Sequence, residues 1–547
     1  MLLDLPFPLA GPLPAWRSIF AWVALAPLLV GILRLPQAFP EKKRRWRLKW
    51  AFLAGWLSGA IWFGANCYWV YNTMHLYGGM GPALATLSLV LFSLYLGVWF
   101  GAFALVLAMV GEATVGGKFG WIGLAVVPFL WTAMEFALAR VPGFPWDLLG
   151  YSQIDNGLLT KIAPWTGVYG ISFVLAAVNA LLVVRLVLRR SPGRFSMRVY
   201  CSSLGVMIVL VGTSGLVLRP PHPKAEATAV LVQPNLDVAA DDVWVGPEWD
   251  RHIKQFRELA ARTCGGYIAG MPETSAPDLQ PLCARPALPP DLIVWPESPA
   301  PFRSEDFKFA TDVESIVVTE KASGMIVGVI GMEKDQSEQR YHFYNSADVI
   351  QQDGNTIGRY DKIHLVPFGE YVPHRELFFF VRQIAQSLTD MSAGSYRKVF
   401  MLGGHRYGIF ICYESVFSDE VRQFAQLGGE IFVNISDDGW YGDSSAPWQH
   451  LNMARMRAIE NRRWILRDTN NGVTASIDPY GTVRQSIPRH QVDALPAQFG
   501  YSSEITFYTA HGDWLAELCA ILSLVLIVWS GRVLLGLSGL KRSVEAA

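Results

Sequence analysis

Charged residues are scarce in this chain: they make up 17% of its 547 residues, whereas an average soluble domain has roughly 25%. Hydrophobic residues make up 51%, and the mean hydropathy is positive. The 46 basic and 46 acidic residues cancel, so the net charge gives no support to nucleic-acid binding. These totals favour a membrane protein, and the chain is too long for one ordinary domain.

Cysteine and histidine are also in short supply. The six cysteines form no CxxC pair, and the ten histidines form no HxxxH or HxH pair, which argues against a disulfide-rich scaffold and a metal site. No glycine-rich phosphate loop is evident, so a nucleotide is not implied. The expected chemistry calls for no cofactor. Cys264 and Cys283 lie in a loop-like insert, 262–285, and whether they pair in an oxidising compartment is open. Three further cysteines lie in apolar runs and are interpreted as small fillers: Cys67, Cys201 and Cys519.

Long apolar runs, in contrast, are abundant. A membrane-spanning helix needs about 20 mostly apolar residues. Seven runs qualify, near 17–36, 49–71, 82–111, 120–141, 162–188, 199–219 and 513–536. We therefore expect three parts: a transmembrane bundle over 1–220, a soluble domain over 221–512, and a C-terminal transmembrane helix with a short tail over 513–547.

The basic residues of the short loops predict the orientation of these spans. The loops 41–49 and 189–198 and the tail with Lys541 and Arg542 are basic, and all three face the cytoplasm if the spans are threaded in order. This threading places 221–512 on the outer side. The opposite orientation would require the basic loops to face outward.

Two features of the membrane part are left open by the sequence. Residues 1–16 hold four prolines and are too short to span, so they are interpreted as an interfacial or re-entrant segment. Glu135 lies inside a predicted span, where a carboxylate is costly. A hydrogen-bonding role between helices and a functional role fit Glu135 equally well.

From residue 227 onward the pattern changes to short β-rich runs that alternate with helical stretches. The segment 448–464 predicts a helix with a mixed surface, and 476–487 predicts a hairpin. Six runs predict strands: ATAVLVQPN, DLIVWPES, SGMIVGVIGM, YHFYNSADVI, YGIFICYE and GEIFVNIS. This alternation is typical of layered α/β folds in which helices cover a largely buried sheet.

Three reactive side chains stand at or near the ends of such runs. Glu297 ends LIVWPES, Lys362 lies in GRYDKIHLVPFGEYVP, and Cys412 ends GIFICYE. Taken singly they can be a helix cap, a solvated lysine and an inert buried thiol. Strand ends in layered α/β folds converge on a site, however.

Together the three predict a specific chemistry. A carboxylate beside a thiol can act as general base and then as general acid. An ammonium group can stabilise first the thiolate and then an oxyanion, and the backbone N–H of Tyr413 can complete the oxyanion hole. The expected reaction is acyl transfer through a thioester.

The motifs WPES, YDKIHLVPFGEYVP and CYE, in this order, resemble the Glu–Lys–Cys triad of the nitrilase superfamily. Three longer blocks, 67–80, 142–155 and 434–481, resemble the apolipoprotein N-acyltransferase family. The resemblance covers about residues 50 to 530 and includes both the membrane part and the outer domain.

The resemblance implies a multi-span α-helical membrane bundle that carries an αββα nitrilase-like domain on the outer face of the bacterial inner membrane. It implies that the acyl group comes from a phospholipid, typically phosphatidylethanolamine. The acceptor would be the α-amino group of a diacylglyceryl-cysteine at the start of an apolipoprotein. A monomer is expected. The apolar run 376–385 would either line an acyl groove at the membrane interface or form a packed helix.

Residue by residue, Glu297 matches the family's general base, Lys362 its oxyanion-stabilising lysine and Cys412 its nucleophile. The supporting residues that match are Glu370, a second carboxylate that would position the lysine or assist proton transfer, and the nucleophile's neighbours Tyr413 and Glu414.

The chain departs from the family pattern in two places. The family usually has eight spans, whereas seven are found here, and the insert 262–285 has no assigned role. Two other functions are also conceivable: a membrane-anchored amidase that transfers acyl groups to water, and a lipid-binding or transport protein. Seven spans argue against the first, since a hydrolase needs one anchor, and an intact Glu–Lys–Cys set argues against the second.

Overall fold

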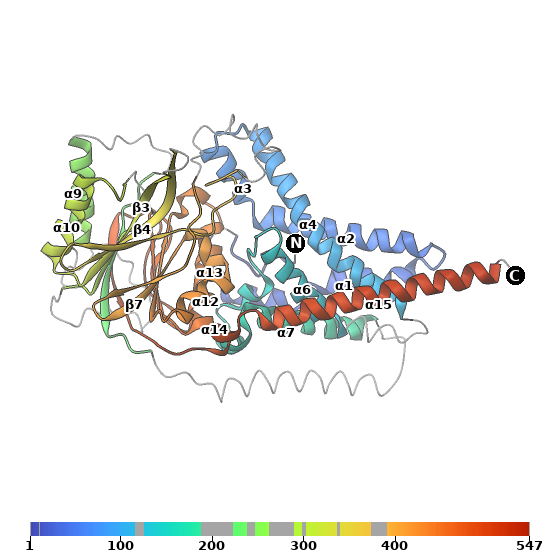
Figure 1. Cartoon of the computed structure of the whole chain (residues 1–547). Coiled ribbons are helices and arrows are strands. Elements are labelled where there is room, and N and C mark those ends of the chain that lie inside the picture. Colours follow the sequence, from blue (N-terminus) through green and yellow to red (C-terminus); the bar gives the residue numbers. More distant parts are fainter. Residues whose placement is uncertain are drawn as a thin grey trace. The chain divides into compact units, whose positions relative to one another are not determined.

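The computed structural model describes residues 2–9, 11–114, 125–187, 223–237, 247–261, 289–297, 302–335, 340–372 and 391–545. The chain forms two compact units (Figure 1). The first contains the described parts of Met1–Tyr71, Ala83–Pro220 and His511–Ala547. The second contains the described parts of Asn72–Pro82 and Pro221–Ala510. The segment Asn72–Pro82 thus belongs to the second unit, although apolar helices precede and follow it.

The first unit is helical. Its main helices are α1 (Ala26–Ala38), α2 (Arg44–Asn66), α4 (Pro82–Ala113), α6 (Val127–Arg140), α7 (Ala163–Val187) and α15 (Trp514–Glu545). Its short turns are η1 (Ala15–Trp22), α3 (Trp69–Asn72), η3 (Leu149–Gln153) and η4 (Leu159–Ile162). Within this unit α6 packs against α7 and α15, and α1 packs against α2 and α7.

Four stretches among the described residues are long and apolar enough to cross a membrane: Trp16–Ala38, Pro82–Ala113, Leu159–Val183 and Trp514–Gly536. They match four of the predicted spans. The predicted span 49–71 overlaps α2 but is not among these four stretches, since α2 ends at Asn66 and carries Trp, Gly and Ser among its apolar residues. The predicted span 120–141 is described as the shorter helix α6, and 199–219 lies outside the described residues.

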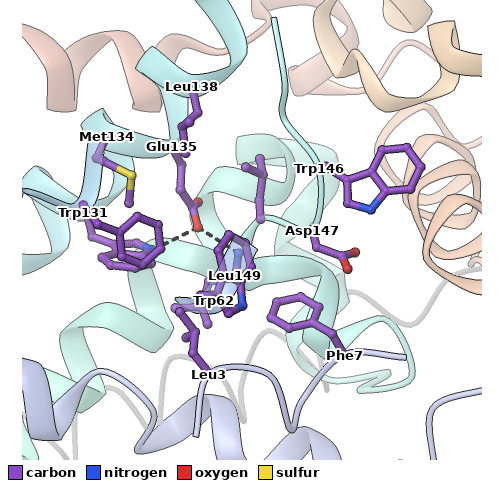
Figure 2. Close-up of a pocket in the computed structure, with 12 residues that line it drawn as sticks. Leu3, Phe7, Trp62, Trp131, Met134, Glu135, Leu138, Trp146, Asp147 and Leu149 are labelled. Carbon is purple, nitrogen blue, oxygen red and sulfur yellow. Dashed lines mark hydrogen bonds between the residues drawn. The ribbon is translucent and has the colours of Figure 1, made fainter. Parts of the chain in front are cut away.

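The structure favours one of the two interpretations of Glu135. In Figure 2 its carboxylate lies between α6 and η3: Oε1 accepts hydrogen bonds from Nε1 of Trp131 (2.9 Å) and from the N–H of Leu149 (2.8 Å). The carboxylate therefore ties a helix to a later turn of the chain. The cavity beside it, also lined by Asp147, has a volume of about 10 Å³, the size of one water molecule. These contacts favour a structural role.

The second unit is built on two six-stranded sheets, in the orders β12-β1-β2-β3-β4-β5 and β11-β10-β9-β8-β7-β6. The first sheet contains β1 (Ala227–Gln233), β2 (Leu292–Val294), β3 (Gly324–Asp335), β4 (Arg340–Gln351), β5 (Thr356–Asp361) and β12 (Asp493–Phe499). The second contains β6 (Val399–Leu402), β7 (His405–Ile411), β8 (Ile431–Ser436), β9 (Ile465–Thr469), β10 (Thr474–Ile477) and β11 (Val483–Ile487). Strands β1 to β3 are parallel, as are β7 to β9.

Helices cover the outer face of each sheet, which confirms the predicted αββα sandwich. On one side α9 (Pro247–Ala260) and α10 (Phe307–Glu320) pack against the first sheet, and on the other α12 (Ser418–Gln426) and α13 (Ala446–Asn461) contact the second (Figure 1). The two sheets contact each other through β1 with β9, β12 with β10 and β11, and β4 with β7. Because both faces of the central strands are covered, β8 is buried at every position, including its polar residues Asn434 and Ser436.

The predicted local elements of 434–487 are confirmed, with one difference. The helix predicted at 448–464 is α13, which ends at Asn461 because Arg462 adopts a left-handed conformation (φ 52°). Its polar face is not solvated: Arg457 and Glu460 are both buried and form an ion pair of 3.0 Å. The hairpin predicted at 476–487 is the antiparallel pair of β10 and β11. The remaining short elements of this unit are η2 (Thr73–Tyr77), η5 (Cys412–Val416), η6 (Asp438–Tyr441) and α14 (Phe507–His511).

Candidate active site

The three residues predicted at strand ends are brought together in the second unit. Glu297 follows β2, Lys362 follows β5, and Cys412 follows β7, so both sheets contribute to one cluster. All three side chains are buried: the exposed fraction is 7% for Glu297, 1% for Lys362 and 6% for Cys412. Such burial of charged groups is tolerated only when they pair with one another.

Lys362 pairs with two carboxylates. Its Nζ lies 3.2 Å from Oε1 of Glu297 and 2.9 Å from Oε1 of Glu370. Burial alone would lower the pKa of Lys362, but the two carboxylates outweigh it and raise that pKa well above its ordinary value. Lys362 therefore remains an ammonium group in spite of its burial.

Cys412 is held in an uncommon backbone conformation. Its φ is 49°, in the left-handed region that residues with a Cβ rarely adopt, and it begins the turn η5. Strain of this kind often marks functional sites. Burial and the charge of Glu297 raise the pKa of the Cys412 thiol well above its ordinary value, while Lys362 opposes them. The resting group is therefore a protonated thiol that needs a base.

Sequence analysis missed Asn345, which joins the two carboxylates. Its Nδ2 donates to Oε1 of Glu297 and to Oε1 of Glu370, both at 2.6 Å, and its backbone carbonyl accepts from the N–H of Lys362. Oε2 of Glu370 in turn accepts from the N–H of Val366 (2.7 Å), a contact within the loop that carries Glu370. The available signal was a polar pair, Asn345-Ser346, in the middle of a run that reads as a buried strand.

Glu414 links the nucleophile's turn to the strand that carries the lysine. Its Oε1 accepts from the N–H of Ile363 and the hydroxyl of Tyr360, each at 2.8 Å, and its Oε2 accepts from the N–H of Ile411. The carboxylate is buried, and it holds the backbone N–H groups of Ile363 and Ile411. Tyr413, also buried, packs its ring against Phe417 and His364.

A further turn, η6, bounds the site. The N–H of Asp437, just before η6, donates to Oε2 of Glu297 (2.7 Å). Trp440 in η6 meets the segment Asn72–Pro82: its carbonyl accepts from Oγ1 of Thr73 (2.9 Å), and its ring packs edge-on against Tyr77 (5.7 Å between centroids). The block 67–80, noted in the sequence, therefore includes residues that contact a turn of the candidate site.

Some predictions fall on residues that are not described: the apolar run 376–385 and the insert 262–285 with Cys264 and Cys283. Cys67 and Cys519 are buried free thiols, as expected of fillers. Within the described ranges no group of three His, Cys, Asp or Glu side chains is arranged to hold a metal ion.

Two family models match the chain. Residues 2–181 match the apolipoprotein N-acyltransferase N-terminal domain, and residues 251–492 match the carbon-nitrogen hydrolase family. An apolipoprotein N-acyltransferase of Geobacter metallireducens is 32% identical over 95% of this chain and 91% of its own length. An apolipoprotein N-acyltransferase of Pseudomonas putida is 31% identical over 94% of this chain and 92% of its own length.

Solved structures of the nitrilase superfamily align with about half of the chain. The alignment with a nitrilase-superfamily protein of Saccharomyces cerevisiae covers 53% of this chain and 96% of that protein, at 16% identity and a TM-score of 0.36. The alignment with an amidase from Nesterenkonia covers 54% of this chain and 96% of the amidase, at 13% identity and a TM-score of 0.35.

The two-sheet sandwich and the carbon-nitrogen hydrolase match place the second unit in the nitrilase class of enzymes, which act through a cysteine. The membrane part matches a separate family model. The chain belongs to the apolipoprotein N-acyltransferase family, and it is an acyltransferase and a bacterial membrane protein.

Proposed function

We propose that Cys412 takes an acyl chain from a membrane phospholipid and passes it, as a thioester, to the α-amino group of a diacylglyceryl-cysteine at the start of an apolipoprotein. The observation that carries this proposal is the placement of one ammonium group, Lys362, against two carboxylates beside a buried thiol. Glu297 acts as the base, and Lys362 stabilises the oxyanion.

In the first half-reaction Glu297 takes the proton of the Cys412 thiol while sulfur attacks the ester carbonyl carbon of the phospholipid. Nζ of Lys362 and the N–H of Tyr413 donate hydrogen bonds to the resulting oxyanion and stabilise it. The carbon–oxygen bond then breaks, and Glu297 returns its proton to the leaving oxygen, which gives a lysophospholipid and the thioester. Glu370 and Glu414 hold Lys362 and its backbone in place.

In the second half-reaction the amine nitrogen attacks the thioester carbon, and Glu297 takes one of its protons. The same two donors stabilise the oxyanion that forms when the amine attacks the thioester. The carbon–sulfur bond breaks, and the proton passes from Glu297 to the sulfur of Cys412, so the enzyme returns to its starting state. The products are a triacylated lipoprotein and the free thiol.

The setting of the reaction is part of the proposal. We take 221–512 as the catalytic domain, and 1–220 with 513–547 as its membrane part, in a monomer. The basic loops 41–49 and 189–198 support an orientation in the inner membrane with the catalytic domain in the periplasm. The donor is expected to be phosphatidylethanolamine.

The test is the intact mass of the purified protein after incubation with phosphatidylethanolamine alone, for the wild type and for Cys412→Ala. We expect an acyl-sized increase on the wild type only. A diacylglyceryl-cysteine peptide should then discharge the adduct and itself become N-acylated. Discharge to water in preference to the peptide would favour a hydrolase, and the absence of any adduct under conditions where the lipid binds would overturn the covalent mechanism.

A further inference from the structure

His450 is a buried ionisable group that the proposed reaction does not use. It lies in α13, is fully buried, and contacts the turn of the nucleophile. Its Nε2 lies 3.0 Å from the backbone carbonyl oxygen of Cys412 and 2.7 Å from Oγ of Ser415. The ring therefore touches the peptide group that joins Cys412 to Tyr413.

The other side of the ring is anchored by charged groups. Nδ1 lies 2.9 Å from Oδ1 of Asp438 and 3.1 Å from Nη2 of Arg467. Arg467 also donates to both carboxylate oxygens of Asp438, at 3.0 and 2.8 Å, and to Oδ1 of Asn434. His450, Asp438 and Arg467 are completely buried, so the ring sits in a fixed frame.

The contact with the carbonyl of Cys412 has only one possible sense: a carbonyl oxygen can only accept, so Nε2 must carry a hydrogen and donate it. Nδ1 faces both the carboxylate of Asp438, which can only accept, and the guanidinium of Arg467, which can only donate, so these two contacts cannot both be hydrogen bonds. Burial and the neighbouring Arg467 lower the pKa of His450 and outweigh Asp438 and the carbonyl of Cys412, which raise it.

The carbonyl of Cys412 is mechanically coupled to the proposed oxyanion hole. In a trans peptide the C=O of one residue and the N–H of the next point in opposite directions within one rigid plane, and the described chain contains no cis peptide bond. Fixing the carbonyl oxygen of Cys412 against His450 therefore fixes the direction of the N–H of Tyr413. The left-handed φ of Cys412 needs such a restraint, because that conformation is unfavourable for a residue with a Cβ.

We propose that His450 is a positioning residue: by donating from Nε2 to the carbonyl of Cys412, it aims the N–H of Tyr413 at the developing oxyanion. This inference rests on the proposed thioester chemistry at Cys412. It adds a histidine to the machinery that neither touches substrate nor moves a proton in the reaction.

The test compares two substitutions of similar polarity. In His450→Gln the side-chain amide reaches the position of Nε2 and can donate to the carbonyl of Cys412, whereas in His450→Asn it reaches only the position of Nδ1. His405→Gln is the matched control. His405 begins β7, the strand that Cys412 follows, and its ring stacks on Tyr501 at the end of that strand away from Cys412.

Two rates are measured for each full-length variant: acylation of Cys412 by phosphatidylethanolamine, and alkylation of Cys412 by iodoacetamide, each followed by mass of the Cys412 peptide. Alkylation needs the thiol but forms no oxyanion. We expect His450→Asn to acylate about 10²-fold more slowly, the order of cost of an oxyanion-hole donor, with an unchanged alkylation rate and an unchanged KM for the lipid. His450→Gln should recover most of the acylation rate.

Parallel loss of acylation and alkylation in His450→Asn would show that the ring supports only the fold or the thiol, and would overturn the inference. Equal acylation by the Asn and Gln variants would overturn it as well. Failure of the wild type to form any acyl adduct would instead overturn the proposed function, so the two failures are distinguishable.

Discussion

Replacing Glu297 by Gln should slow acyl transfer and at the same time make Cys412 more reactive toward a simple alkylating agent. The substitution keeps the size of the side chain and removes its charge. That charge has two effects in the structure: it supplies the base for the thiol, and it raises the pKa of Cys412, whereas the charge of Lys362 lowers it. The two effects act in opposite directions on thiolate formation.

The magnitudes separate the two effects. Loss of a general base typically costs about 10²–10⁴-fold in rate, so acylation by phosphatidylethanolamine should fall by that factor. Alkylation should rise, because each unit by which the pKa of Cys412 falls gives about tenfold more thiolate at neutral pH. In Glu297→Gln, Lys362 also keeps only one carboxylate partner, Glu370, so its charge acts more strongly on the sulfur.

The assay is the rate of iodoacetamide alkylation of the Cys412 peptide as a function of pH, for the wild type and Glu297→Gln. The wild-type rate should rise at higher pH than that of an ordinary thiol, since burial and Glu297 raise the pKa of Cys412, and the curve for Glu297→Gln should be displaced to lower pH. Glu370→Gln is the matched control, because Glu370 shares Lys362 but is not the proposed base. Slower alkylation of Glu297→Gln at every pH would refute the electrostatic reasoning.

Three further predictions concern buried charges. Lys362→Met leaves Glu297 and Glu370 facing each other without their cation, so it should abolish acylation and lower the free energy of unfolding by about 3–5 kcal/mol in chemical denaturation. Burial raises the pKa of Asp348 from 3.8 to about 6, so the protonated group contributes its full stabilisation below pH 3.8, and this contribution is lost as the pH rises through about 6. Asp348→Asn should therefore raise the free energy of unfolding, relative to the wild type, by up to about 3 kcal/mol at pH 7.5 and by nothing near pH 3.5. Melting curves at the two pH values measure this difference. Glu135→Ala leaves the N–H of Leu149 without its acceptor, so it should lower the free energy of unfolding by about 1–3 kcal/mol, as measured by thermal unfolding in detergent. The acylation rate per folded molecule should stay that of the wild type. A selective loss of that rate would favour the functional interpretation of Glu135 instead.

The central strands could be predicted from sequence because both of their faces are covered. β3, β7 and β8 each contain an apolar run of several residues, and such runs are visible without knowledge of their neighbours. β9 escaped prediction because Arg467 and Asp468 interrupt its sequence, ILRDT, although both side chains are buried. A buried charge is indistinguishable from a solvated one until its partners, such as Asp438, are placed in space.

The same reasoning separates the site residues that could be predicted from those that could not. Glu297 and Cys412 stand at the ends of apolar runs and Lys362 lies in a loop after a strand, and convergence of strand ends predicts their proximity. Asn345 and His450 act from the middle of a strand and of a helix, where a polar residue has no positional signature. Their roles depend on which carboxylate or carbonyl lies opposite, and only the packing of two sheets and a helix decides that.

The charges of the site also constrain how the proposed reaction can proceed. With a neutral thiol, the ammonium group of Lys362 and the carboxylates of Glu297 and Glu370 leave one net negative charge in a buried cluster. Release of the thiol proton to solvent would add a second negative charge, at a high cost in a medium of low dielectric constant. Transfer of that proton to Glu297 keeps the net charge constant, and its return to the leaving oxygen keeps it constant again. A reactive amine must obey the same balance, so it must enter the site neutral and give a proton to Glu297 as its nitrogen attacks the thioester.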